Sequence, residues 1–125
     1  MSHDIIADAL NELMNAKRAR KDVVVVDRFS KLLLKVLEIG KNLGYIEDYK
    51  TNDTKLEIKF TDKLNQCRVI KPRFNFTKQE IDKYLRRYLP ARDMGAIIVS
   101  TDKGLMTHQN AIEKNIGGAL IAYFY

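Results

Sequence analysis

The most constraining feature of this chain is an alternating segment, Lys55–Thr61. Leucine, isoleucine and phenylalanine alternate there with lysine, glutamate and threonine (KLEIKFT), and this period of two is typical of a sheet with one buried and one wet face. Turn-forming residues, Thr51–Thr54, separate the segment from a second strand-like run, Tyr45–Lys50. The pattern therefore predicts two strands joined by a turn.

Two helices and a short strand are expected before these strands. Apolar residues recur at helical spacing from Ile6 to about Ala16, which predicts the first helix. The β-branched run Val23–Val26 is short enough to indicate a buried strand. Ser30 is placed to cap a second helix, and Gly44 is placed to end it. This half of the chain therefore reads as αβαββ.

The second half begins after a polar segment, Asp62–Gln66, which is the best candidate for a domain boundary. Strands are expected at Arg68–Lys71 and, fully buried, at Ala96–Val99. Between them, Thr77–Glu80 fits a capping box that opens a helix, and Pro90 is expected to end it.

The rest of the second half adds a turn, a short helix and a final strand. Gly104 is expected to take a positive φ in the loop after the buried strand. Thr107 is placed to cap a short helix, and Ala119–Tyr125 alternates like a strand. We expect an α+β fold of two small α/β subdomains packed together: an αβαββ subdomain at residues 1–64, and a mainly β subdomain with one or two helices at residues 65–125.

Positive charge gathers in the second half of the chain. Residues 1–65 hold 12 basic and 11 acidic residues, whereas residues 66–125 hold 10 and 5. Clustered lysine and arginine is the electrostatic footprint of a polyanion such as nucleic acid, because each neutralised phosphate releases counterions. The same charge also suits a solvated surface that binds nothing anionic, so charge alone leaves both interpretations open.

Several classes of protein are excluded. No apolar run approaches the roughly 20 residues that a bilayer crossing needs, and the acidic N-terminal segment does not resemble a secretory signal. A single cysteine, Cys67, makes no internal disulfide and fits a reducing compartment. Neither His3 nor His108 has ligand spacing to it, so we expect no metal site and no cofactor.

A catalytic interpretation has little support. Ser100, Asp102 and His108 lie close in sequence, but no G-x-S-x-G motif surrounds the serine. The loop at Gly104 lacks the second glycine and the Lys-Ser/Thr pair of a phosphate-binding Walker loop. A small enzyme that uses the Ser100 loop remains the weakest alternative, and a basic protein-interaction module without a specific RNA target is the stronger one.

The segment Gly95–Ile112 (GAIIVSTDKGLMTHQNAI) stands out as a candidate binding site. A buried strand delivers Ser100 and Thr101 to its end, where hydroxyls can donate and accept hydrogen bonds. Lys103 adds a positive charge, and Gly104 permits a close approach of the backbone. RNA recognition favours such groups on a rigid platform, because unpaired bases are read along their edges.

This segment resembles the signature of a universal family, small ribosomal subunit protein eight. Three further stretches are similar to that family in the same order: HDIIADALNELMNA, SKLLLKVLEIGKNLGYIEDYK and the pair Gly117-Gly118 before the last strand. KPRFNF and YLPARD resemble its archaeal and eukaryotic branch. The resemblance covers nearly the whole chain. It implies a structural, non-enzymatic protein of the small subunit in the cytoplasm, with ribosomal RNA and neighbouring small-subunit proteins as partners.

The resemblance further implies binding to the central domain of small-subunit RNA and support of subunit assembly and translation. Hydroxyls and backbone at the signature would contact nucleotides, basic residues would contact phosphates, and Phe74 would stack on a base or be buried. In the C-terminal subdomain the expected RNA-binding residues are Ser100, Thr101, Lys103, Gly104, Thr107, Arg73, Phe74, Arg86, Arg87 and Arg92. In the N-terminal subdomain they are Asn15, Lys17, Arg18, Lys31 and Lys35.

Overall fold

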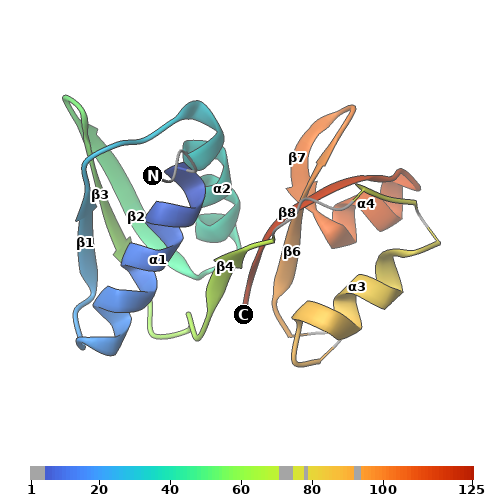
Figure 1. Ribbon diagram of the computed structural model, residues 1–125, viewed down its shortest axis with the longest axis horizontal. Helices are drawn as coiled ribbons and strands as arrows, with labels where there is room; N and C mark the ends of the chain where they lie inside the picture. Colours follow the sequence, from blue (N-terminus) through green and yellow to red (C-terminus); the bar gives the residue numbers. More distant parts are fainter. Residues whose placement is uncertain (1–4, 71–74, 78, 92–93) are drawn as a thin grey trace. The chain divides into compact units, whose positions relative to one another are not determined.

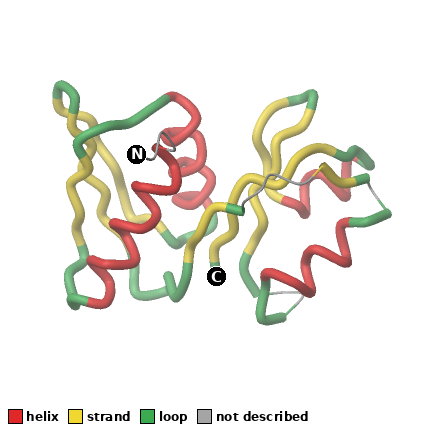
Figure 2. Tube along the Cα trace, viewed as in Figure 1, coloured by secondary structure: helices red, strands yellow, loops and turns green. Residues whose placement is uncertain are grey.

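The computed structural model describes residues 5–70, 75–77, 79–91 and 94–125. The chain divides into two compact units, Met1–Arg68 and Val69–Tyr125. The described residues form four helices and two antiparallel sheets (Figures 1 and 2), so the α+β class expected from the sequence is confirmed.

The first unit is a three-stranded sheet with two helices. Its elements are α1 (Ile5–Arg18), β1 (Val23–Val26), α2 (Lys31–Asn42), β2 (Ile46–Asn52) and β3 (Lys55–Phe60). The strand order is β1-β3-β2, so β3 lies in the centre and β1 at an edge. α1 contacts β1, α2 contacts β2, and the helices contact each other, so they cover one face of the sheet (Figure 1). The predicted αβαββ order is confirmed.

The apolar alternation in β3 faces the two helices. Leu56 and Ile58 are completely buried and Phe60 nearly so, which confirms the predicted dry face. The predicted strand at Val23–Val26 is confirmed, but its predicted burial is wrong for Val25, which is 52% exposed, whereas Val26 is buried. Val25 pairs with Glu57 of β3, so its side chain lies on the face of the sheet opposite Leu56 and Ile58, and that face is in contact with water.

Local signals set the ends of α2. The Ser30 side chain accepts a hydrogen bond from the Leu33 backbone N–H at 3.2 Å, as expected for an N-cap. The helix ends at Asn42, and Gly44 follows with a φ of +91°. A residue with a Cβ is strained in that conformation, so glycine suits the exit from the helix.

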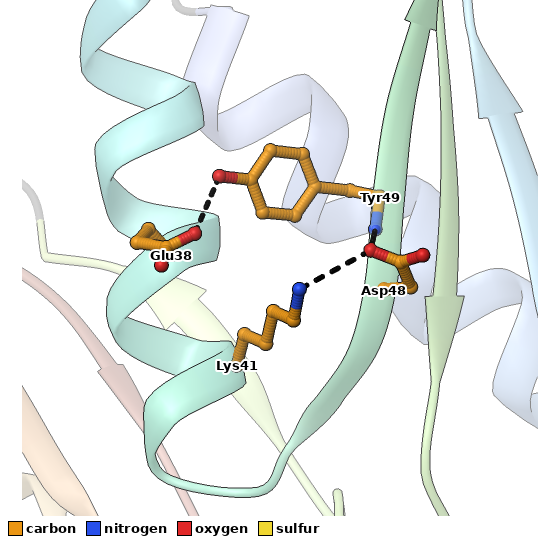
Figure 3. Close-up of polar contacts among 4 residues, drawn as sticks. All are labelled: Glu38, Lys41, Asp48 and Tyr49. Atoms are coloured by element: carbon orange, nitrogen blue, oxygen red, sulfur yellow. Dashed lines mark hydrogen bonds and ion pairs between the residues drawn. The ribbon is translucent and has the colours of Figure 1, made fainter.

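Polar contacts tie α2 to β2 (Figure 3). The Tyr49 hydroxyl donates to the Glu38 carboxylate at 2.7 Å, and this hydrogen bond, with some burial, raises the pKa of Tyr49 to about 12. Lys41 Nζ lies 3.4 Å from Asp48 Oδ1, which also accepts from the Tyr49 backbone N–H at 2.9 Å. The backbone donor first, and Lys41 second, hold the pKa of Asp48 below its usual value.

The second unit contains a sheet in the order β4-β8-β6-β7, with β5 also pairing with β8. The strands are β4 (Cys67–Val69), which begins in the first unit, β5 (Asn75–Phe76), β6 (Ala96–Thr101), β7 (Gly104–Thr107) and β8 (Gly118–Phe124). Two helices, α3 (Ile81–Tyr88) and α4 (His108–Lys114), complete the unit. Residues from α3 and from the sheet share one core, which includes Leu85, Ile97, Val99 and Leu120.

The start of α3 differs from the prediction. The Thr77 backbone N–H donates to the Glu80 carboxylate at 3.1 Å, which is one half of a capping box. The Thr77 hydroxyl donates to the same carboxylate instead of accepting from the backbone. The helix therefore begins later, at Ile81, after a turn closed by the Glu80 N–H and the Thr77 carbonyl. Its end before Pro90 is confirmed.

Candidate nucleic-acid interface

The candidate site is built on the β6–β7 hairpin of the second unit. β6 is wholly buried from Ala96 to Val99 and pairs with both β7 and β8, so it is a rigid support. Ser100 and Thr101 form the last two positions of the strand, each half-buried. Only Asp102 and Lys103 separate them from β7, and both are exposed.

The Thr101 hydroxyl is engaged in shaping this turn. It donates to the Gly104 carbonyl at 3.0 Å and accepts from the Lys103 backbone N–H at 3.1 Å. A hydroxyl has one donor and two acceptor positions, so Thr101 keeps a single acceptor position for a ligand. Its first role in the molecule is to hold the hairpin end.

Ser100 has the open hydrogen-bonding capacity that Thr101 lacks. No hydrogen bond of its hydroxyl is found among the described residues, and the residue is half-buried. Its backbone lies between Leu105 of β7 and Ala119 of β8. The backbone of Ser100 is therefore held by two neighbouring strands, and its hydroxyl can both donate to and accept from a ligand.

Two glycines shape the backbone around these residues for different reasons. Gly104 has a φ of +106°, and no atom lies within 4 Å of the place where a Cβ would be. It therefore leaves open space beside the turn for a ligand. Gly118 is required for packing, since a Cβ there would come 2.1 Å from the Ser100 carbonyl oxygen.

Thr107 has a structural role in this site. Its side chain accepts from the Asn110 backbone N–H at 3.3 Å and so caps α4, which confirms its predicted capping function. Because Thr107 is only 7% exposed, the structure gives no support to its expected contact with RNA. Lys103 is exposed at the turn and is the cation closest in sequence to Ser100.

Arg86 and Arg87 lie at the other end of β6. α3 ends where the chain turns into β6, whereas Ser100 and Thr101 lie at the far end of that strand (Figure 1). The structure therefore does not bring these arginines together with the hairpin. Both are exposed. The other expected residues of this subdomain, Arg73, Phe74 and Arg92, lie outside the described residues.

A cluster of tyrosines beside Arg87 is missing from the residues expected from the sequence. The rings of Tyr88 and Tyr123 lie 5.5 Å apart between centroids, and those of Tyr123 and Tyr125 stack at 6.0 Å. The Arg87 guanidinium lies 5.6 Å from the centre of the Tyr88 ring. The alternation of Tyr123 and Tyr125 could have indicated that these two rings share a face of the last strand. It could not indicate that Arg87 and Tyr88 of α3 lie beside them.

The basic residues expected in the first unit also form two groups. Asn15, Lys17 and Arg18 lie at the end of α1, where β1 begins, and Arg18 donates to the Asn15 side chain at 3.4 Å. Lys31 and Lys35 lie at the start of α2, beyond the opposite end of β1 (Figure 1). The structure does not join them into one surface.

His108 and Cys67 are both buried. His108 is 2% exposed, and its Nδ1 accepts from the Ile97 backbone N–H at 3.1 Å; burial lowers its pKa. Burial also raises the pKa of the Cys67 thiol to about 12. Among the described residues no group of side chains is placed to hold a metal ion, and none of the helices there is long and apolar enough to span a bilayer.

Comparison with known proteins identifies similar chains. A family model described as Ribosomal protein S8 matches residues 4–125. The small ribosomal subunit protein uS8 of Nanoarchaeum equitans is 43% identical over 129 residues, and that of Picrophilus torridus is 36% identical over 129 residues, each alignment covering both chains completely. The protein uS8A of Schizosaccharomyces pombe is 34% identical over 125 residues, which is 97% of this chain and 96% of the relative.

Proposed function

The chain belongs to the ribosomal protein S8 family, and from that premise we propose that it is a structural component of the small ribosomal subunit that binds the central domain of its RNA. Its family consists of ribosomal proteins and not of enzymes. On this proposal the protein works in the cytoplasm, contacts neighbouring small-subunit proteins, and supports subunit assembly and translation.

The end of the β6–β7 hairpin carries this proposal. A half-buried Ser100 hydroxyl without a partner among the described residues stands beside open space at Gly104 and the exposed charge of Lys103. Such a group reads an unpaired base edge or a ribose hydroxyl, and the lysine adds attraction to any phosphate nearby. The strands on either side hold it, so little entropy is lost on binding.

Thr101 belongs to the same surface in a supporting role. Its two hydrogen bonds to Lys103 and Gly104 keep the turn in shape, and its remaining acceptor position is open to RNA. Thr107 is excluded from the proposed interface, because its hydroxyl caps α4 and its side chain is buried.

Arg87 and the tyrosines supply a second, separate contact. A guanidinium over a ring is a surface on which a splayed base can stack, and the charge also attracts phosphate. Arg86 adds charge from the next position of α3. Because about 100° separates successive residues on a helix, Arg86 and Arg87 contact different parts of the RNA.

The basic residues of the first unit would add two phosphate contacts at opposite ends of β1. One is made by Asn15, Lys17 and Arg18, and the other by Lys31 and Lys35. Such contacts raise affinity for any RNA without reading its sequence. Specificity therefore comes from the hairpin and the shape of the RNA.

Binding of the intact chain to a transcript of the central domain tests the proposal. Gel shifts at fixed salt should show much tighter binding than to an unrelated structured RNA of equal length, and hydroxyl-radical footprints should be confined to one irregular helix. Equal affinity for both RNAs contradicts the proposal and favours a nonspecific basic protein. Affinity for acidic proteins without any RNA preference would instead indicate a protein-interaction module.

A further inference from the structure

A second type of binding surface lies in the first unit, along the outer edge of β1. β1 is the end strand of its sheet and, among the described residues, pairs with β3 alone. Its four residues are all valine, and no lysine, proline or bulge interrupts them. Exposed strand edges pair readily with other chains, so proteins normally protect them with such features. Here the charged residues stand only before and after the strand.

The register shows which backbone groups face outward. The Phe60 N–H donates to the Asp22 carbonyl at 3.1 Å, so Asp22 and Phe60 form a hydrogen-bonded pair. Because such pairs alternate in antiparallel sheets, Val24 and Val26 bond to β3 through Ile58 and Leu56. The N–H and C=O of Val23 and Val25 therefore point away from the sheet.

A hollow runs between this edge and α1. Residues of both elements line a cavity of about 480 Å³, and a second one of about 450 Å³ continues it, with Glu12 and Val25 lining both. Two alanines of α1, Ala9 and Ala16, and Ala19 directly after the helix are among the lining residues. Such short side chains leave room for another backbone to approach.

The first of these hollows is acidic in a chain whose formal net charge is +6. Three carboxylates, Asp8, Glu12 and Asp27, line it against one guanidinium, Arg28. Arg28 is already paired with Asp8 at 3.3 Å. Glu12 and Asp27 have no ion pair among the described residues. This charge repels RNA and attracts lysine or arginine.

We propose that the outer edge of β1 and the acidic hollow beside α1 bind an extended, basic segment of a partner protein, which adds a strand to the sheet. Backbone groups of the segment would pair with Val23 and Val25. Alternate side chains of an added strand point to opposite faces. One row would present lysine or arginine to Glu12 and Asp27, and the other would lie beside Val25 with apolar groups. The acidic hollow contains none of the residues proposed to contact RNA, whereas Asn15, one of those residues, lines the second hollow.

The test uses the intact, isotope-labelled protein and a blocked peptide, Lys-Val-Lys-Val-Lys-Val. Amide shifts in the NMR spectrum should be confined to β1 and the facing side of α1. In the protein alone, the Val25 N–H should exchange with solvent far faster than the Val24 N–H, and it should become protected when the peptide binds. A peptide with glutamate in place of lysine should not bind.

Matched variants separate the backbone from the charge. Val25→Pro removes an outward donor without breaking a bond to β3. Peptide affinity should therefore fall roughly two- to tenfold, as expected for a lost hydrogen bond, whereas Val25→Thr keeps the donor and should retain the affinity. The double variant Glu12→Gln, Asp27→Asn should weaken binding roughly three- to tenfold. Glu113→Gln, on α4 and outside the lining residues, should have no effect.

Several results would overturn the proposal. One is that the Val25 N–H of the protein alone exchanges with solvent as slowly as the Val24 N–H. The others are that the peptide does not bind at millimolar concentration, or that the lysine and glutamate peptides bind equally well. A short single-stranded RNA that shifts the same amides more strongly would make the edge an RNA site. A dimer in sedimentation that Val25→Pro abolishes would make a second copy the occupant. If Val25→Pro fails to fold, two measurements still test the proposal. These are hydrogen exchange at Val25 in the unaltered protein and the peptide affinity of the double variant Glu12→Gln, Asp27→Asn.

Discussion

The two hydroxyls at the end of β6 should respond to mutation in opposite ways. Ser100→Ala removes a hydroxyl that has no partner in the described part of the chain, so the free energy of unfolding should change by less than about 0.5 kcal/mol. If the hydroxyl bonds to RNA, its loss costs about 0.5–1.5 kcal/mol. Affinity for the central-domain RNA should therefore fall roughly two- to tenfold.

Thr101→Val should instead weaken the protein itself. It removes two hydrogen bonds, to the Gly104 carbonyl and from the Lys103 N–H. Both are at the surface, where water replaces part of the loss, so the free energy of unfolding should fall by about 1–2 kcal/mol. Thr101→Ser retains both bonds and should come close to the unaltered protein.

Urea unfolding followed by circular dichroism measures the stability of the three variants, and gel shifts under identical salt measure RNA affinity. Unrelated RNA serves as the reference, since loss of a hydroxyl that reads one nucleotide should leave nonspecific binding unchanged. An Ser100→Ala protein with unaltered stability and unaltered affinity for the central domain would refute the proposed role of the hydroxyl. Unaltered stability of Thr101→Val would refute the structural role of the threonine.

Three further predictions follow from other parts of the structure. Gly118→Ala should destabilise the protein by about 2–3 kcal/mol, because its Cβ would lie 2.1 Å from the Ser100 carbonyl oxygen. Gly104→Ala has open space around its Cβ but a positive φ, so it should destabilise the protein by about 1–2 kcal/mol. Urea unfolding of both variants measures these losses. Burial holds the folded-state pKa of His108 below its unfolded value of 6.5, so the unfolded chain takes up a proton first as the pH falls. This contribution to stability is complete above about pH 6.5 and is lost below it. His108→Asn should therefore reduce the difference in unfolding free energy between pH 7.5 and pH 5.5. If that difference stays the same in the variant, other groups cause the pH dependence. Arg87→Ala should weaken binding to every RNA and reduce the slope of log affinity against log salt by about one, whereas an unchanged slope would place Arg87 away from phosphate.

Local patterns were sufficient to predict most of the elements. The alternation in Lys55–Thr61 needs only neighbouring residues to define a dry face, and Leu56 and Ile58 are indeed buried. Ser30 and Thr107 cap helices as predicted, because a cap bonds to backbone within three residues. Thr77 and Glu80 show the limit of this reasoning. Here the Thr77 hydroxyl binds the Glu80 carboxylate instead of the backbone, and the helix begins only at Ile81.

The candidate site was predicted only in part, because its residues are assembled by the sheet. The sequence placed Ser100, Thr101 and Gly104 at a strand end, and they do lie there. It did not distinguish the two hydroxyls, since their difference depends on where the Gly104 carbonyl and the Lys103 N–H point.

The sequence by itself determined the α+β class, the element order of the first unit, and the family to which the chain belongs, because these depend on local periodicity and motifs. Tertiary structure alone decided that β1 is an edge strand, that Arg87 stacks beside Tyr88 at the opposite end of β6 from Ser100, and that an acidic hollow borders Val25. Strand order and register join residues far apart in the chain. A period of two shows which face of a strand is dry, but not whether another strand lies beside it.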